Sequence, residues 1–293
     1  MVTLYEYAEA RNAAYDLLRF LRITAAVCAA LPALICGPAR AGAWIPAAGA
    51  GELEPMVRYF FADQSFPQDS FSTATLPSTK EHGTQIRLLG EHGLGDGFSL
   101  DYDLRYGFLY SSKVKNGVTV VDTNDGLQEQ RIGLNYGLTQ DKDFADSIGL
   151  GVVFPGSSAA KSPALDNGHW AVEPMYRIGF NPGLWQLSGN LDVEPRIFLD
   201  GGVTQFRTHL EISVPAIQRV RLAGVLFFVR SARMGGYNDL RDRGELYNLL
   251  RLGIEAKFHL TDSIEPVLAY ENNVAGMGGH ASQRFTFGVK ISY

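Results

Sequence analysis

Alternation of apolar and polar residues with a period of two dominates this sequence and limits the folds open to it. In the segment FSLDYDLRYGFLY, every second residue from Phe98 to Tyr110 is apolar or aromatic, and most residues between them are polar or charged. Successive side chains of a strand point to opposite faces, so the segment predicts a strand with one apolar and one charged face. A helix would scatter the same residues around its circumference.

The pattern recurs along the rest of the chain, and no segment of useful length shows the helical period after the N-terminal leader. It is clearest at 98–110, 132–138, 170–180, 206–214, 250–260 and 285–293. Weaker versions occur at 52–61, 83–91, 147–154, 185–198, 219–230 and 264–271. We therefore predict about twelve strands of roughly eight to fourteen residues each.

The apolar face of each strand must be covered, and the length of the strands indicates by what. Tilted strands of about ten residues match the thickness of a bilayer core. Backbone groups in lipid need internal partners, so the sheet must close on itself. We predict an all-β, closed antiparallel transmembrane β-barrel of about twelve strands, apolar outside and polar inside. A soluble lipocalin-like barrel is the alternative, but it would have an apolar interior and usually about eight strands.

The connections between the predicted strands support a membrane barrel, because long and short ones alternate. Long polar gaps are expected near 62–80, 112–126, 155–168, 231–245 and 272–283. Short ones are expected near 92–97, 139–145, 181–184, 215–218 and 261–263. The gap at 199–204 is shorter than this order predicts. Aromatic residues at strand ends fit girdles at the two membrane interfaces; these are Tyr59, Tyr110, Trp170, Phe180, Trp185, Tyr247, Tyr270 and Tyr293.

The first 41 residues read as an export signal ahead of the barrel domain at 42–293. Arg19 and Arg22 precede an uncharged apolar run from Ile23 to Cys36, and Ala39-Arg40-Ala41 offers small residues for cleavage. A run of about fourteen residues suits a signal peptide and is too short for a relaxed membrane span. The preceding residues 1–18 form an unusually acidic leader. Cys28 and Cys36 are the only cysteines, so the mature chain must be stable without disulfides.

The C-terminal strand RFTFGVKISY ends on Tyr293 and resembles the signal that the barrel-assembly machinery recognises in Gram-negative outer-membrane proteins. The segments GIEAKFHLTDSIEPVLAYENN and QRFTFGVKISY are similar to the meta-pathway phenol-degradation-like family of outer-membrane transporters, as is the opening AWIPAAGAGELEPMVRYFFADQSF. The resemblance implies a barrel in the bacterial outer membrane, surrounded by its lipids, with a role in uptake of small organic solutes, aromatic compounds among them. It assigns no binding residue.

The polar faces of the strands carry acidic and basic residues in nearly equal number. In a barrel of this size such side chains would face one another across the lumen, and arginine pairs with carboxylates in a bidentate manner. They could form a network that stiffens and partly plugs the barrel, or line a narrow pathway that selects the solute. The candidate lumen-lining residues, chosen near strand middles, are Arg58, Arg105, Arg177, Arg207 and Glu211.

The sequence favours a passive channel for a small organic solute over two alternatives. One is a structural or adhesive barrel with a closed lumen. The other is an outer-membrane lipid hydrolase, for which His280 and Ser282 are the only loose candidate pair. The carboxylates at 101 and 103 and the VVDTNDG segment at 120–126 are weak cation candidates. The chain shows no nucleophile elbow, no dinucleotide-binding motif and no basic stripe for nucleic acid, so we expect no enzymatic activity, no cofactor, no metal and no nucleic-acid partner.

Overall fold

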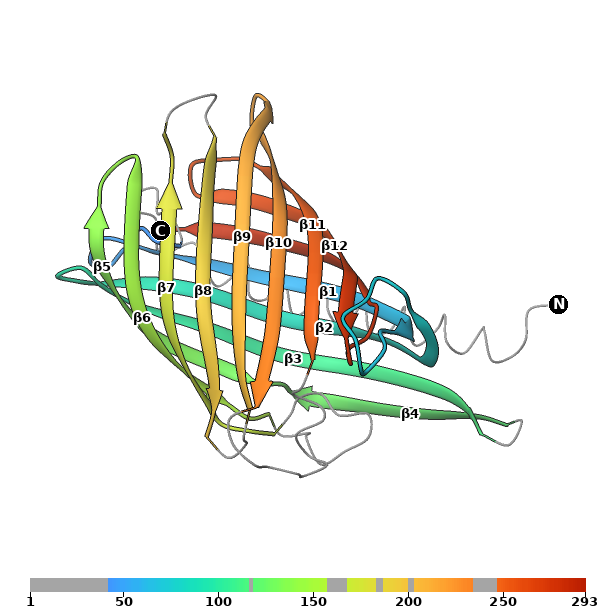
Figure 1. Cartoon of the computed structure of the whole chain (residues 1–293). Coiled ribbons are helices and arrows are strands. Elements are labelled where there is room, and N and C mark those ends of the chain that lie inside the picture. The colour runs from blue at the N-terminus through green and yellow to red at the C-terminus, as the bar shows by residue number, and fades with distance from the viewer. Residues whose placement is uncertain (1–41, 116–117, 157–167, 183–186, 200–202, 234–246) are drawn as a thin grey trace. The chain divides into compact units, whose positions relative to one another are not determined.

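The computed structural model describes residues 42–115, 118–156, 168–182, 187–199, 203–233 and 247–293, and the proposed signal peptide lies outside them. These residues form one antiparallel sheet (Figure 1). Its strands are β1 (Gly51–Ser65), β2 (Leu76–Gly95), β3 (Phe98–Lys115), β4 (Val118–Leu127), β5 (Gln130–Gln140), β6 (Phe144–Phe154), β7 (Ala171–Phe180), β8 (Ser188–Phe198), β9 (Val203–Ile217), β10 (Val220–Arg233), β11 (Asn248–Phe258), β12 (Ile264–Met277) and β13 (Gln283–Ser292).

Twelve of these strands close into a barrel. Each pairs with its neighbours along the chain, β3 pairs with both β2 and β5, and β1 pairs with β13 to complete the ring. The closing seam runs from Glu52 opposite Ser292 to Phe61 opposite Gln283. Every strand of the ring therefore has a partner on both sides, which satisfies backbone groups that lipid could not. The predicted closed antiparallel barrel is confirmed, and each of the twelve predicted segments overlaps one of its strands.

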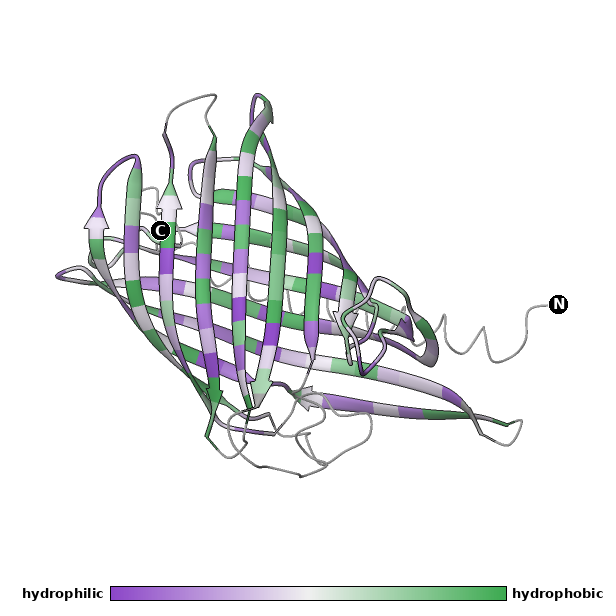
Figure 2. Cartoon of the chain, in the orientation of Figure 1, coloured by the Kyte–Doolittle hydropathy of each residue, from purple (hydrophilic) through white to green (hydrophobic). Residues whose placement is uncertain are grey.

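The outer surface of the barrel is apolar and the inner surface is polar. The bands of opposite hydropathy that alternate along the strands in Figure 2 reflect this. On β5, the outward side chains of Ile132, Leu134 and Tyr136 are each more than two-fifths exposed, whereas the inward Asn135 is buried. A soluble barrel would have the reverse distribution, so the lipocalin-like alternative is wrong. Among the described residues, no helix is long and apolar enough to cross a bilayer.

The structure corrects the prediction of a long loop at 112–126. Here β3 continues beyond the rest of the barrel and β4 pairs back along it, from Lys115 opposite Val118 to Tyr106 opposite Leu127. In Figure 1 this β3–β4 hairpin extends well past the neighbouring strands. β4 and β5 pair one after the other with β3. β4 pairs with its outer part, and β5 pairs with the part within the barrel, beginning at Arg131 opposite Asp103. Gln128 and Glu129 lie in the break between them.

Two of the other expected long loops are shorter than predicted. The expected long gaps at 62–80 and 272–283 are mostly strand, leaving 66–75 and 278–282 between strands. A two-residue turn joins β2 to β3 through Asp96 and Gly97, with φ of 51° and 80°. Two consecutive residues with positive φ are what a two-residue hairpin turn requires, and Asp-Gly supplies them at low cost.

Lipid contact can be tested by placing a charge at two depths on the outer wall. Leu150, at the middle of β6, and Leu94, beside the β2–β3 turn, are 55% and 52% exposed. We expect Leu150→Arg to lower the unfolding free energy in bilayers by about 2–4 kcal/mol and Leu94→Arg by about 0–1 kcal/mol. Urea unfolding in lipid vesicles measures both. Equal costs would contradict the assignment of the mid-strand surface to the bilayer core.

Candidate functional site

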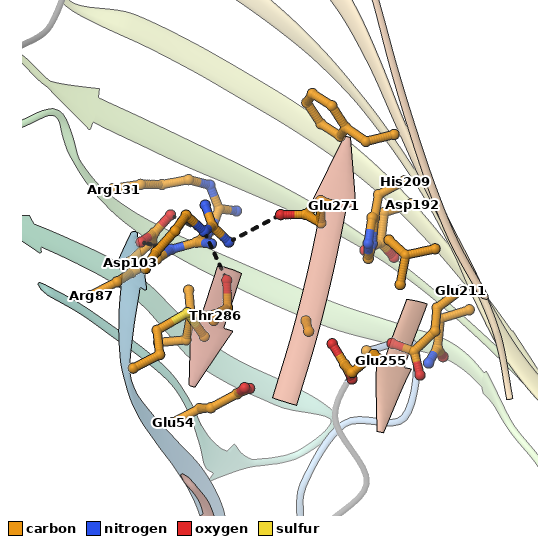
Figure 3. Close-up of a pocket in the computed structure, with 18 of the residues that line it drawn as sticks. Glu54, Arg87, Asp103, Arg131, Asp192, His209, Glu211, Glu255, Glu271 and Thr286 are labelled. Carbon is orange, nitrogen blue, oxygen red and sulfur yellow. Dashed lines mark hydrogen bonds and ion pairs between the residues drawn. The ribbon is translucent and has the colours of Figure 1, made fainter. Parts of the chain in front are cut away.

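A cavity of about 570 Å³ lies inside the barrel and is lined mainly by charged side chains. All five residues named from the sequence, Arg58, Arg105, Arg177, Arg207 and Glu211, line it. In Figure 3, Arg87, Asp103 and Arg131 gather on one side of the cavity, with Asp192, His209 and Glu211 across from them. The cavity wall divides into three groups of side chains with different degrees of charge pairing.

The first group, the arginine–carboxylate network, begins at two aspartates on β3. Asp103 accepts two hydrogen bonds from Arg87 on β2, at 2.7 and 2.8 Å, and also pairs with Arg105. Asp101 pairs with Arg131 at 2.6 Å and with Arg177 at 2.8 Å. Charge-assisted pairs of this kind are the strong hydrogen bonds of proteins. Because both carboxylates are engaged by guanidinium groups, the cation site considered at 101 and 103 is wrong.

Glu173 on β7 continues the network across the barrel. Its carboxylate pairs with Arg131 at 2.8 Å, with Arg207 at 3.5 Å and with Arg196. Glu173 and Arg196 are each only 1% exposed. Burial of charge is costly unless the charge is paired, and both of these charges are paired. The network therefore fixes the lumen-facing side chains of β2, β3, β5, β7 and β8 in one arrangement.

Glu129 joins the two ends of this network and was not among the sequence candidates. It lies in the break between β4 and β5, outside any alternating segment, and bridges Arg105 at 2.6 Å and Arg196 at 2.7 Å. Gln130 beside it bonds both the N–H and the carbonyl of Arg105 at 3.0 and 2.7 Å. The break between β4 and β5 thus places the Glu129 carboxylate in the lumen. A period-two pattern cannot predict this position, because the alternation is interrupted there.

The second group, the lysine–carboxylate group, lies toward the end of the barrel that holds the start of β1 and the end of β13. Lys257 pairs with Glu211 at 2.6 Å and with Glu255 at 3.0 Å, and Lys290 pairs with Glu52 at 2.7 Å. Glu211 therefore has a lysine partner rather than an arginine one. This group contains more carboxylates than lysines, since Glu54 also lines the cavity here.

The third group is loosely paired. Glu271 on β12 faces Arg58 on β1 and Arg251 on β11, each at 3.8 Å. Arg58 also donates to Thr286 at 3.2 Å, and the dashed lines that reach Glu271 and Thr286 in Figure 3 mark these contacts. Arg284 on β13 lines the same part of the cavity. We call Arg58, Arg251 and Arg284 the arginine trio.

A strap formed by residues 42–50 crosses the lumen at the end where β1 begins. Gly42 lines the cavity, and a side chain there would lie 2.8 Å from Asn190 on β8. The Trp44 indole donates to the carbonyl of Asp141 at 2.9 Å, and Gly49 bonds Gly93 on β2. β8 and β1 are six strands apart in a ring of twelve, so the strap spans the width of the barrel.

The candidate hydrolase pair does not form a nucleophile–base hydrogen bond. The Ser282 hydroxyl accepts a hydrogen bond from Asn273 at 2.8 Å, whereas the His280 ring faces Glu81 at 3.5 Å. No group of three or more potential metal-ligating His, Cys, Asp or Glu side chains occurs in the part of the chain that the structure describes. Tyr247 lines the cavity, so its assignment to an interfacial girdle is wrong; Trp185 lies outside the described residues.

The fold is shared with known outer-membrane barrels, although no protein-family model and no curated protein matches the sequence. An outer-membrane channel from Pseudomonas putida F1 superposes with a TM-score of 0.63 at 11% identity, covering 88% of this chain and all of that one. The NanC porin superposes with a TM-score of 0.51 at 10% identity, covering 82% and 98%. At such identities the likeness shows the fold alone. Together with the apolar outer wall, it shows that this chain has the transmembrane β-barrel fold of outer-membrane proteins.

The arginine–carboxylate network should contribute strongly to stability. Glu173→Gln removes the negative charge shared by three guanidinium groups, and we expect it to lower the unfolding free energy by about 3–5 kcal/mol. Asp122→Asn breaks the solvent-exposed pair with Lys113 and should cost less than about 1 kcal/mol. Denaturant titration of both variants measures the difference. An unaltered unfolding midpoint for Glu173→Gln would show that the network is dispensable for stability.

Proposed function

We propose that this protein is a passive channel that takes up a small organic solute across the outer membrane through its charged lumen. One observation carries the proposal: the interior side chains leave a cavity of about 570 Å³, although charged groups from opposite walls meet across the lumen. Cavities of about 300–1,000 Å³ accommodate organic molecules of moderate size. A barrel with a purely structural interior would need no such space.

The pattern of ion pairs in the lumen supports a pathway for a solute as well as a role in stabilising the barrel. The arginine–carboxylate network satisfies the charges on one side of the lumen. The arginine trio and Glu54 face the cavity with weaker or no pairing among the described residues. Charges of this kind can select a passing solute, because their interactions are not already saturated. The resemblance of the C-terminal segments to outer-membrane transporters, and the description of the superposed proteins as a channel and a porin, agree with this proposal.

The strap favours the alternative of a barrel with a closed lumen, because it reaches across one opening. Its anchors include the Trp44 indole on Asp141, the Gln140 side chain bonded to the Ile45 N–H at 2.8 Å and to the Ala43 carbonyl at 3.0 Å, and the backbone pairing at Gly93. We propose that the strap narrows the pathway without sealing it. A lipid hydrolase is the less favoured function, since Ser282 and His280 are engaged by other partners, and we propose no enzymatic activity.

Reconstitution of the purified protein into planar bilayers tests transport directly. We expect stepwise current increments, and in liposome-swelling assays we expect faster entry of small organic solutes than of sugars too large for the lumen. Heat-unfolded protein in the same detergent serves as the control. Absence of both conductance and solute flux would refute the channel proposal.

Deletion of residues 43–48, joining Gly42 to Gly49, tests the role of the strap. We expect a higher single-channel conductance than in the unaltered protein, because the segment that crosses the opening is removed. Trp44→Ala should produce a smaller increase, since the backbone anchors at Gly49 and Gly93 remain. Single-channel recordings compare the three proteins. Unchanged conductance in the deletion variant would mean that the strap does not limit flow.

A further inference from the structure

The arginine trio forms an uncompensated positive region on one side of the lumen. Its members and Glu271 come from β1, β11, β12 and β13, which are consecutive in the ring. Glu271 lies directly opposite Arg284 in the β12–β13 register, and Arg58 lies opposite Thr286, two residues further along β13. Three guanidinium groups against one carboxylate leave a net charge of +2 at this place.

Glu271 does not neutralise the trio. Its oxygens are 3.8 Å from Arg58 and from Arg251, well beyond the roughly 2.7–2.9 Å of a charge-assisted hydrogen bond. Among the described residues, Arg284 has neither an ion pair nor a hydrogen bond. Asp103, the carboxylate that pairs with Arg87 nearby, is already shared between Arg87 and Arg105.

Two of the three guanidinium groups are nevertheless held in place by neutral acceptors. The Nε of Arg58 donates to Thr286 at 3.2 Å, and the Nε of Arg251 donates to the side-chain oxygen of Asn273 at 2.9 Å. Arg251 is also stacked over the ring of Phe227, 4.9 Å from its centroid. Because Nε is used for anchoring, the terminal N–H groups stay available for a ligand. Orientation before binding reduces the entropy lost on association.

An apolar strip borders the trio and defines what the rest of the ligand must be. Phe227 on β10 lies opposite Arg251 and is followed on the lumen face by Val225. On β12, Ala269 precedes Glu271 on the same face, and Val267 follows in the same direction, away from Glu271. These four side chains make up the strip. A ligand that satisfies both surfaces has a carboxylate at one end and an apolar body at the other. Guanidinium groups suit a carboxylate because two parallel N–H groups match its two oxygens.

We propose that the arginine trio, with Phe227 and the adjoining apolar strip, is a binding site for a small organic carboxylate. The inference rests on the proposed channel function and names the class of solute that the channel selects. A ligand carboxylate between Arg58, Arg251 and Arg284 replaces the missing counter-charge, and the apolar body lies against Phe227. Neutral solutes of the same shape gain only the apolar contact and bind more weakly.

Calorimetric titration of the folded protein in detergent, with benzoate and its neutral isostere benzamide as probes, tests the site. We expect benzoate to bind at least about tenfold more tightly than benzamide, because charge-assisted hydrogen bonds contribute the difference. Arg284→Gln should weaken benzoate binding by about tenfold and leave benzamide binding unchanged. The matched control is Arg221→Gln, which removes an arginine that hydrogen-bonds Ser188 and Ser213 away from the trio.

The outcomes separate the site from the channel. Equal binding of benzoate and benzamide, no binding of benzoate, or the same loss in Arg221→Gln as in Arg284→Gln would overturn the proposed site. The comparison of the two probes on the unaltered protein decides the matter even if a variant fails to fold. Benzoate binding in a protein that shows neither conductance nor solute flux would uphold the site and refute the channel. Conductance or solute flux without a preference for benzoate over benzamide would uphold the channel and refute the site.

Discussion

Closure of the sheet is the constraint on which the rest of this structure depends. In hydrocarbon, an unpaired backbone N–H or carbonyl has no water to bond, so a strand without a neighbour on each side is strongly disfavoured. The pairing of β1 with β13 removes the last two edges of the ring. Once the ring is closed, the period-two alternation has only one consistent orientation, because the apolar side chains must contact lipid. Charged residues from most strands of the ring are then directed into one enclosed space.

Enclosure makes the pairing of those charges the second determinant. A carboxylate such as Glu173 can be tolerated at 1% exposure only because several guanidinium groups surround it. Small residues on neighbouring strands make room for this: a side-chain carbon on Gly151 would lie 2.8 Å from the Nε of Arg131. Ion pairs across the lumen restrict how far these side chains can move aside for a solute. The opposite side, around Glu271, is less tightly bound and better suited to exchange its partners with a ligand.

Most of the fold could be predicted from the sequence because alternation reports directly which residues face lipid. The same alternation, which we call parity, also predicted the lumen position of five residues: Arg58, Arg105, Arg177, Arg207 and Glu211. Parity could not predict pairing, since which arginine meets which carboxylate depends on the stagger of strands that are distant along the chain. The alternation therefore could not show that Arg207 pairs with Glu173 whereas Arg284 has no such partner among the described residues. Arg284 was not among the sequence candidates. Glu129 was not predicted because it lies in the break between β4 and β5, outside any alternating segment. Tyr247 was assigned to the wrong face because a position at a strand end does not specify whether the ring points to lipid or to the lumen.

The strap has a practical consequence for handling the protein. If the export signal is removed after Ala41, the first residue of the mature chain, Gly42, starts within the cavity beside Asn190. A purification tag fused at that point would then have to be accommodated inside the lumen or pull the strap out with it. Recordings from such a fusion would report the behaviour of an obstructed or an unstrapped barrel rather than that of the native one.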